Sequence, residues 1–309
     1  MSRESIVINE VGPRDGLQSQ EGKLSLEQRQ AFVEAIQGAG LRHIEIGSFV
    51  SPKAVPQMAG TGDLARALLS EDGVAASAHY TALVPNMKGF ELACEAGMDT
   101  VAVVVSATET MNQKNINMSL EQTMQVAHDV IERGTREGIR VQAYLAVAFE
   151  CPFEGAVPAH HVQSLATELL AAGASELVVS DTIGAADPAQ VKAMMTEMVA
   201  AHGAQRLACH FHDTRAMGLA NVFAAIESGV RRFDASVGGL GGCPFAPGAK
   251  GNVATEDVVM LCEQMGYDTG VDMPALLAVV DLIGDMLGRS QGGRAHYWLS
   301  RNWPGRKAA

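Results

Sequence analysis

Residues 39–48 read Ala-Gly-Leu-Arg-His-Ile-Glu-Ile-Gly-Ser, and this stretch shows the pattern that decides the fold. Its first glycine suits the left-handed position that ends a helix, and the isoleucine-containing run that follows favours a β-strand. The same order of helical pattern, glycine and strand-like run recurs with the glycine at Gly97, Gly138, Gly173, Gly203 and Gly229. The chain therefore repeats a helix-to-strand unit.

Eight strand-like runs can be counted along the chain. They are Ile6–Glu10, His43–Gly47, Ala76–Leu83, Thr100–Ser106, Val141–Val147, Leu177–Asp181, Leu207–His212 and Phe233–Val237. Amphipathic helices are expected between them, for example over Leu26–Gln37 and Leu120–Arg136, with Ser25 and Ser119 as N-caps. Eight strands alternating with helices predict an α/β fold of the (β/α)8 TIM-barrel type. An open doubly wound sheet is the rival fold, but Gly-Pro-Arg-Asp-Gly follows the first strand where that fold usually carries a glycine-rich fingerprint.

The domain organisation follows from the length and from the lack of any low-complexity linker. We expect one domain over residues 1–309, because α/β barrels of this length routinely form a single domain. The barrel would occupy residues 5–268. An extra helix over residues 273–288 would lie in a C-terminal segment of residues 269–309.

The composition excludes several classes of protein. Hydrophobic residues make up 47% and charged residues 19%, a globular balance, and the net charge of −12 disfavours nucleic acid as a partner. No apolar run is long enough to span a membrane and no targeting segment is evident, so we expect a cytoplasmic protein without a membrane partner. The five cysteines are odd in number and form no CxxC pair, which favours free thiols.

The clearest local motif is Cys209-His210-Phe211-His212-Asp213 on the seventh expected strand. Alternate residues of a strand face opposite sides, so His210 and His212 would point into the barrel mouth while Cys209 packs under the helices. Two imidazoles on one face of a strand can bind one metal ion. The alternative is a pair of hydrogen-bonded, inert histidines.

Other polar side chains follow other strands. Asp15 could supply a hard carboxylate ligand and Arg14 a planar cation for an oxyanion, unless the turn that holds them is an ordinary surface turn. Glu45 alternates with isoleucines, so it faces the barrel interior, where it needs either a salt-bridge partner or a chemical role. Asp181, at the end of an apolar strand, presents the same choice.

Residues 238–252 form a loop with six glycines and two prolines. This composition is typical of a mobile lid over a site. Cys243 is the one nucleophile or acid in the loop, and its alternative role is that of a small buried hydrophobe. Asn252 closes the loop, and its carbonyl could reach a metal.

Taken together, these residues resemble a known family. The segments that carry the resemblance are NEVGPRDGLQ, EIGSFVSPKAVPQMAG, KNIN, ECPFEG, SDTIG, HFHDT and GGLGGCPFAPGAKGNVATED, in this order from residue 9 to residue 257. They are similar to segments of 3-hydroxy-3-methylglutaryl-CoA lyase, in the metal-dependent lyase superfamily of TIM barrels. The ordered set is far more specific than any single motif.

The resemblance implies a cofactor and a set of site residues. The cofactor would be a divalent metal ion, Mg²⁺ or Mn²⁺. Its implied ligands are Asp15, His210, His212 and Asn252. The implied catalytic residues are Arg14, Glu45, Asp181 and Cys243.

The implied reaction is a retro-Claisen cleavage, with a place in leucine degradation. 3-Hydroxy-3-methylglutaryl-CoA, or a close 3-hydroxyacyl-CoA homologue, would give acetyl-CoA and acetoacetate or the matching keto acid. Arg14 would stabilise the enolate oxygen and Cys243 would protonate the enolate carbon, while Asp181, Glu45 or His210 would take the hydroxyl proton. The expected partners are an acyl-CoA thioester and a second copy of the chain in a homodimer.

Alternatives from the same superfamily are a Claisen-condensing synthase and a 4-hydroxy-2-oxoacid aldolase, which share the HxH and Arg-Asp motifs but lack the GGCP motif with its cysteine. A non-catalytic CoA-binding protein would leave the metal ligands unused. The chain departs from the family pattern at Ser19-Gln20-Glu21, Val103–Glu109 and Gly292–Arg306, so the preferred acyl group stays open. We expect the substituent on C3 to lie near Val103–Thr108 and Phe149-Glu150.

Overall fold

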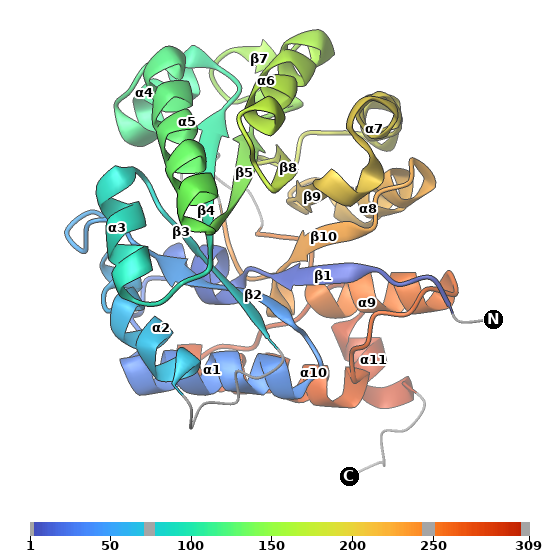
Figure 1. Ribbon diagram of the computed structural model, residues 1–309. Helices are drawn as coiled ribbons and strands as arrows, with labels where there is room; N and C mark the ends of the chain where they lie inside the picture. The colour runs from blue at the N-terminus through green and yellow to red at the C-terminus, as the bar shows by residue number, and fades with distance from the viewer. Residues whose placement is uncertain (1–2, 71–77, 243–250, 304–309) are drawn as a thin grey trace.

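The computed structural model describes residues 3–70, 78–242 and 251–303. Eight parallel strands close into a barrel, which confirms the expected TIM-barrel fold (Figure 1). The barrel strands are β1 Val7–Glu10, β2 His43–Ser48, β3 His79–Leu83, β4 Thr100–Ser106, β5 Arg140–Ala146, β8 Glu176–Asp181, β9 Leu207–Phe211 and β10 Arg232–Ala235. They neighbour one another in chain order, and β10 closes the barrel by pairing with β1, for example Phe233 with Ile8.

Helices surround the barrel (Figure 1). They are α1 Leu26–Gly38, α2 Thr61–Leu69, α3 Met87–Glu95, α4 Glu109–Ile116, α5 Leu120–Glu137, α6 Ala159–Ala171, α7 Pro188–His202, α8 Gly218–Glu227, α9 Thr255–Gln264, α10 Met273–Leu287 and α11 His296–Asn302. Ser25 and Ser119 cap α1 and α5 as expected. Each accepts a hydrogen bond from the backbone N–H three residues on, and the glutamine there accepts one from the serine N–H in return.

The observed strands begin and end close to the expected positions. The seventh barrel strand ends at Phe211 and the eighth at Ala235, because the chain turns there into the loops at the carboxyl ends of the strands. Residues 76 and 77, at the start of the third expected strand, lie outside the described residues.

Among the described residues, two hydrophobic clusters hold the barrel together. The larger one fills the space between the strands and the surrounding helices, and it includes Val103, Val105 and the fully buried Cys209. The smaller one lies inside the barrel and includes Ala102 and Tyr144. This alternation along the strands fixes which side chains face the interior.

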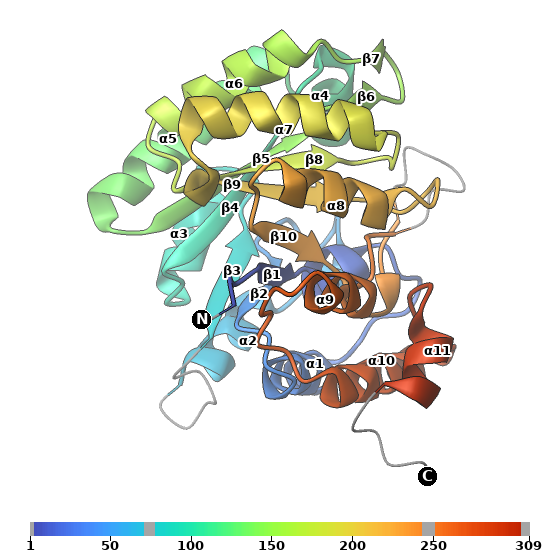
Figure 2. The same ribbon diagram turned by 90° about the vertical axis from the view of Figure 1, so that its right-hand side faces the viewer.

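The described part of the C-terminal segment, up to residue 303, adds two helices to the barrel. The expected helix over residues 273–288 is α10, and it packs beside α1 (Figure 2). The second helix, α11, and a short antiparallel pair of strands, β6 Glu150–Cys151 and β7 Gly155–Ala156, were not expected from the sequence. Within the described ranges, no helix is long and apolar enough to cross a membrane.

Candidate metal and catalytic site

The end of β9 brings two histidines together inside the barrel mouth. The ring centroids of His210 and His212 are 5.1 Å apart, and both residues are buried. Cys209, on the opposite face of the strand, has no exposed surface, and burial raises the pKa of its thiol well above the usual range. The alternation expected for this strand is therefore confirmed, and Cys209 is part of the core.

A tight turn after β1 places Asp15 against these histidines. The backbone N–H groups of Arg14, Asp15 and Gly16 all donate to the carbonyl of Val11, which forms a single π-helical turn over Gly12–Gly16. Asp15 Oδ2 lies 3.8 Å from His212 Nε2. One donor atom from each of Asp15, His210 and His212 lies within 4.8 Å of the others. A single small cation can therefore bridge these three side chains.

The ionisation of Asp15 suits a metal ligand. Burial alone would raise the pKa of its carboxyl group. The Arg14 guanidinium and the imidazoles of His210 and His212 outweigh that effect and hold the pKa well below its usual range. The carboxylate is therefore charged at neutral pH.

Asn252 lies beside the same cluster, since it forms an isolated antiparallel bridge with His212. Its Nδ2 donates to the carbonyl of Leu240 at 3.1 Å and to Asp15 Oδ2 at 2.7 Å. Its Oδ1 is buried and has no hydrogen-bond partner among the described residues. Buried polar atoms are nearly always paired, so this oxygen, which no described residue satisfies, fits a metal ligand. One carboxylate, two imidazoles and an amide oxygen form a donor set suited to a divalent ion such as Mn²⁺.

Arg14 is buried, so the ordinary surface turn considered for it is wrong. Its Nε donates to Glu45 Oε2 at 2.7 Å, and its Nη1 donates to Asp15 Oδ1 at 2.7 Å. Glu45 faces the interior as expected and has no exposed surface. Burial raises the pKa of Glu45 to about 7, despite the opposing effect of Arg14. The other oxygen of Glu45, Oε1, is buried and unpartnered within the described part of the chain.

Asp181 is buried at the end of β8. Its two carboxylate oxygens accept hydrogen bonds from the backbone N–H groups of Ala185, at 2.8 Å, and Ala186, at 3.0 Å. These bonds lower the pKa of the group, but burial outweighs them and raises it. Asp181 therefore holds the loop that follows β8. Cys243 lies outside the described residues.

Comparison with known proteins identifies the family. A family model described as HMGL-like matches residues 5–283. The chain belongs to the HMGL-like family. This HMGL-like chain is 44% identical to the hydroxymethylglutaryl-CoA lyase of Pseudomonas mevalonii, over 94% of its own length and 96% of the relative's.

Two further relatives of this HMGL-like chain are informative. The chain is 42% identical to the 3-hydroxy-3-isohexenylglutaryl-CoA/hydroxymethylglutaryl-CoA lyase of Pseudomonas aeruginosa, over 94% of this chain and 96% of that one. A solved structure of an HMG-CoA lyase from Acinetobacter baumannii, in complex with coenzyme A and 3-methylmalate, superposes with a TM-score of 0.90 at 35% identity, covering 99% and 98% of the two chains.

Two residues that were not expected from the sequence lie behind the histidine pair. His210 Nδ1 lies 3.0 Å from Asp234 Oδ2, and Asn9 Nδ2 donates to Asp234 Oδ1 at 2.9 Å. Asp234 is buried on β10, between two apolar neighbours. Like Glu45, Asp234 is a carboxylate that alternates with apolar residues along a strand, and this pattern indicates that its side chain faces the barrel interior.

Only some side chains of Val103–Thr108, which were expected to lie near the C3 substituent, face the barrel interior. Val103 and Val105 pack between the barrel and its helices, whereas Val104 packs against the inner cluster with Tyr144. The expectation for Val103–Thr108 is therefore wrong for its odd-numbered valines, because the strand alternates. The Tyr144 ring stands edge-on to His210, with centroids 6.2 Å apart.

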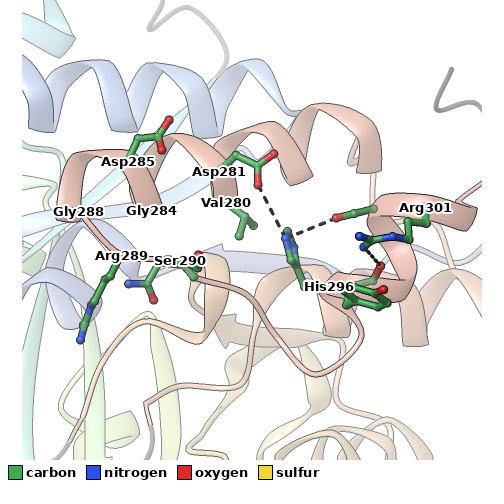
Figure 3. A pocket seen from close by; sticks show the side chains of 12 residues that line it. Val280, Asp281, Gly284, Asp285, Gly288, Arg289, Ser290, His296 and Arg301 are labelled. Atoms are coloured by element: carbon green, nitrogen blue, oxygen red, sulfur yellow. Dashed lines mark hydrogen bonds and ion pairs between the residues drawn. The ribbon is translucent and has the colours of Figure 1, made fainter. Parts of the chain in front are cut away.

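A separate cavity of about 740 Å³ lies between α10 and α11 (Figure 3). His296 points across it toward Asp281, with Nε2 3.8 Å from Oδ1, and Arg289 and Arg301 contribute positive charge. The residues that line it include none of the described metal-ligand or catalytic candidates. The candidate metal and catalytic site therefore lies outside this cavity, and it is defined by the donor atoms that converge at the barrel mouth.

Proposed function

We propose that this HMGL-like protein is a carbon–carbon lyase that cleaves 3-hydroxy-3-methylglutaryl-CoA, or a close 3-hydroxyacyl-CoA homologue, to acetyl-CoA and acetoacetate or the matching keto acid. The names of the relatives and the coenzyme A bound to the Acinetobacter relative support an acyl-CoA substrate. The observation that carries the proposal is a buried arginine, Arg14, fixed beside a cluster of metal-ligand side chains.

The proposed metal ligands are Asp15, His210, His212 and Asn252. Their donor types and the unpartnered Oδ1 of Asn252 support a divalent ion, Mg²⁺ or Mn²⁺. When bound, such an ion supplies Lewis acidity that makes a nearby hydroxyl group easier to deprotonate. It also supplies the positive charge that an anionic substrate needs on a chain with a net charge of −12.

Arg14 is proposed to stabilise the oxygen of the leaving thioester enolate. A guanidinium has five N–H donors, and hydrogen bonds to Glu45 and Asp15 use two of them among the described residues. These two bonds fix the plane of the group before substrate binds. A preorganised donor aimed at a developing negative charge lowers the barrier without reorganisation during the reaction.

Glu45 is the proposed base for the hydroxyl proton. The three candidates differ in how their acceptor atoms are used: Asp181 holds two backbone N–H groups, and His210 Nδ1 faces Asp234. Glu45 alone among them keeps a buried oxygen, Oε1, without a partner in the described part of the chain. Its pKa of about 7 lets it accept and release a proton near neutral pH. Asp181 would then position the loop after β8.

Cys243 is proposed to protonate the enolate carbon after cleavage. The support is its place in the GGCP motif of the family resemblance. The substrate then loses its hydroxyl proton to Glu45 and gains the thiol proton at carbon, and return of a proton from Glu45 to the Cys243 thiolate through solvent would restore the enzyme.

The test of this function is a set of matched assays with saturating Mn²⁺. We expect acetyl-CoA from 3-hydroxy-3-methylglutaryl-CoA, no condensation product from acetyl-CoA and a 2-oxoacid, and no cleavage of CoA-free 4-hydroxy-2-oxoacids. Longer C3 substituents should change kcat/KM by a limited factor, because one methylene in an apolar pocket contributes about 1–3 kcal/mol. Activity in either of the other two assays alone would replace the lyase assignment with the corresponding alternative.

We also propose that residues 1–309 form one domain and that the chain works as a homodimer in the cytoplasm. The described cysteines are all free, which fits a reducing compartment. Light scattering on the purified protein should give twice the 32.5 kDa mass of one chain. A monomeric mass would reject the homodimer.

A further inference from the structure

The segment between α10 and α11, residues 289–295, runs over the N-terminus of α9 and is called the C-terminal strap here. Two buried carboxylates of α9 hold its backbone. Glu256 accepts from the Gly293 N–H at 2.6 Å, and Asp257 accepts from the N–H groups of Arg294, at 2.7 Å, and Ala295, at 3.0 Å. The strap is therefore fixed by three consecutive backbone groups.

The contact between the strap and α9 is close. A Cβ atom on Gly293 would lie 2.5 Å from Ala254 Cβ and 2.6 Å from Asp257 Oδ2, so only glycine fits there. Glu256 also accepts from the Gly238 N–H at 3.1 Å. The backbone position from which the Arg294 side chain departs is thus well defined.

The Arg294 side chain holds the residue that follows the second histidine of the site. Its Nε donates to Asp213 Oδ2 at 2.6 Å, and its Nη2 donates to the Asp213 backbone carbonyl at 3.3 Å. The other carboxylate oxygen of Asp213 accepts from the Gly218 N–H at 2.9 Å, at the start of α8. Asp213 is therefore held by both its side chain and its backbone.

Asp213 in turn connects two of the proposed metal ligands. It follows His212 directly, and its backbone N–H donates to the carbonyl of Gly251, the residue before Asn252, at 3.0 Å. His212 and Asn252 pair across the same bridge. A shift of Asp213 would therefore move both ligands relative to Asp15.

We propose that Arg294 is a positioning residue that keeps His212 and Asn252 in register for binding the divalent ion. This inference rests on the metal site proposed above. The bond between Arg294 and Asp213 is partly exposed, with 46% of the Arg294 side chain accessible. Such pairs contribute little to global stability, so removal of the guanidinium leaves the protein folded.

Removal of the Arg294 side chain has two effects on metal affinity, the loss of a positive charge and the loss of the contact with Asp213, and these predict opposite changes. Loss of a positive charge near a cation site should strengthen cation binding by simple electrostatics. Loss of a positioning contact should weaken it, because residues behind the ligands commonly change metal affinity by about 10–100-fold. The direction of the change therefore separates the two effects.

The experiment is a titration of the metal-free, full-length protein with Mn²⁺, followed by the electron paramagnetic resonance signal of the free ion. Arg294→Ala and Arg294→Met should bind Mn²⁺ about tenfold more weakly than the unmodified chain, at the lower end of that range. Arg294→Lys should recover part of the affinity, since one ammonium cannot keep the two-point geometry of the guanidinium.

Arg301→Ala is the matched control. It removes the same charge from α11, where Arg301 stacks on the Tyr297 ring at 3.7 Å, and it should leave Mn²⁺ binding unchanged. Equal or tighter binding in both Arg294→Ala and Arg294→Met would overturn the positioning role while leaving the metal site standing. An unmodified chain that binds no Mn²⁺ would overturn the metal site itself, and this inference with it.

Discussion

The Nε atom of Arg14 lies 2.7 Å from Oε2 of Glu45, and the Glu45 side chain has no exposed surface. The two residues come from the turn after β1 and from β2. Buried charges are rarely kept unless they are paired or used. The pair also places Arg14 against Asp15, so it links the proposed enolate-stabilising group to the proposed metal ligands.

Replacing Arg14 should therefore impair turnover more than metal binding. Arg14→Met should lower kcat by about 10²–10³-fold, the range expected when a preorganised oxyanion donor is lost. Mn²⁺ binding should persist, because removing a cation next to Asp15 does not weaken attraction for a metal ion. Steady-state kinetics and a parallel Mn²⁺ titration check both parts. A kcat within a few-fold of the unmodified protein would remove Arg14 from the chemistry.

Replacing Asp234 should weaken metal binding through His210. Asp234→Asn removes the charge that faces His210 Nδ1, so the imidazole is less firmly oriented and less basic. Affinity for Mn²⁺ should fall by about 10–100-fold. Glu176→Gln is the control, because Glu176 is another buried carboxylate that bonds Gln142 and Arg232 instead of a proposed ligand. Equal losses of Mn²⁺ affinity in the two variants would show that the lost negative charge, and not the contact with His210, determines the affinity.

The two cysteines assigned opposite roles should respond differently to the same substitution. Cys243→Ser should lower kcat by at least about 10²-fold with metal content intact, as expected for loss of a positioned acid. Cys209→Ser places a hydroxyl in a site with no exposed surface, and it should lower the free energy of unfolding by about 1–3 kcal/mol. Kinetics and chemical denaturation measure the two effects. If Cys243→Ser keeps a normal kcat, that cysteine is structural.

His43 should make the fold sensitive to acid. It lies at the start of β2, stacked on His79 with ring centroids 4.8 Å apart. Partial burial, together with Arg232, His79 and Arg140, lowers the pKa of His43 to about 4. The unfolded chain binds a proton at His43 more readily than the folded chain does. The stability contributed by the neutral His43 side chain is therefore fully present above pH 6.5 and is lost as the pH falls toward 4.

His43→Phe keeps a ring on His79 but cannot be protonated. Melting temperatures at pH 7 and pH 5 should therefore differ less in His43→Phe than in the unmodified protein. Activity at pH 7 should not change, because His43 lies at the opposite end of its strand from the catalytic loops. An identical pH dependence in the two proteins would contradict this assignment.

The sequence predicts much of this architecture, because glycine-terminated helices and β-branched runs are local signals. Strand alternation also placed His210 and Cys209 on opposite faces, since the side-chain period of a strand is two. The same rule, applied to Val103 and Val105, would have removed them from the expected substrate pocket.

The remaining features depend on contacts between distant parts of the chain. The bond between His210 and Asp234 depends on the register of β9 against β10, which no local pattern specifies. The turn at Gly12–Gly16 looks like an ordinary surface turn until the barrel closes over Arg14. The strap contact of Arg294 with Asp213 joins residues 81 positions apart.

The most direct test of the proposed metal-dependent lyase is one titration that follows two signals. Metal-free protein receives increasing Mn²⁺ in the presence of 3-hydroxy-3-methylglutaryl-CoA, while bound Mn²⁺ and acetyl-CoA release are both recorded. We predict that the rate rises in proportion to bound metal and reaches its plateau at one Mn²⁺ per chain, and that His212→Ala shows neither signal. Full activity without metal, or no acetyl-CoA at saturating Mn²⁺, would contradict metal-dependent cleavage of 3-hydroxy-3-methylglutaryl-CoA by this protein.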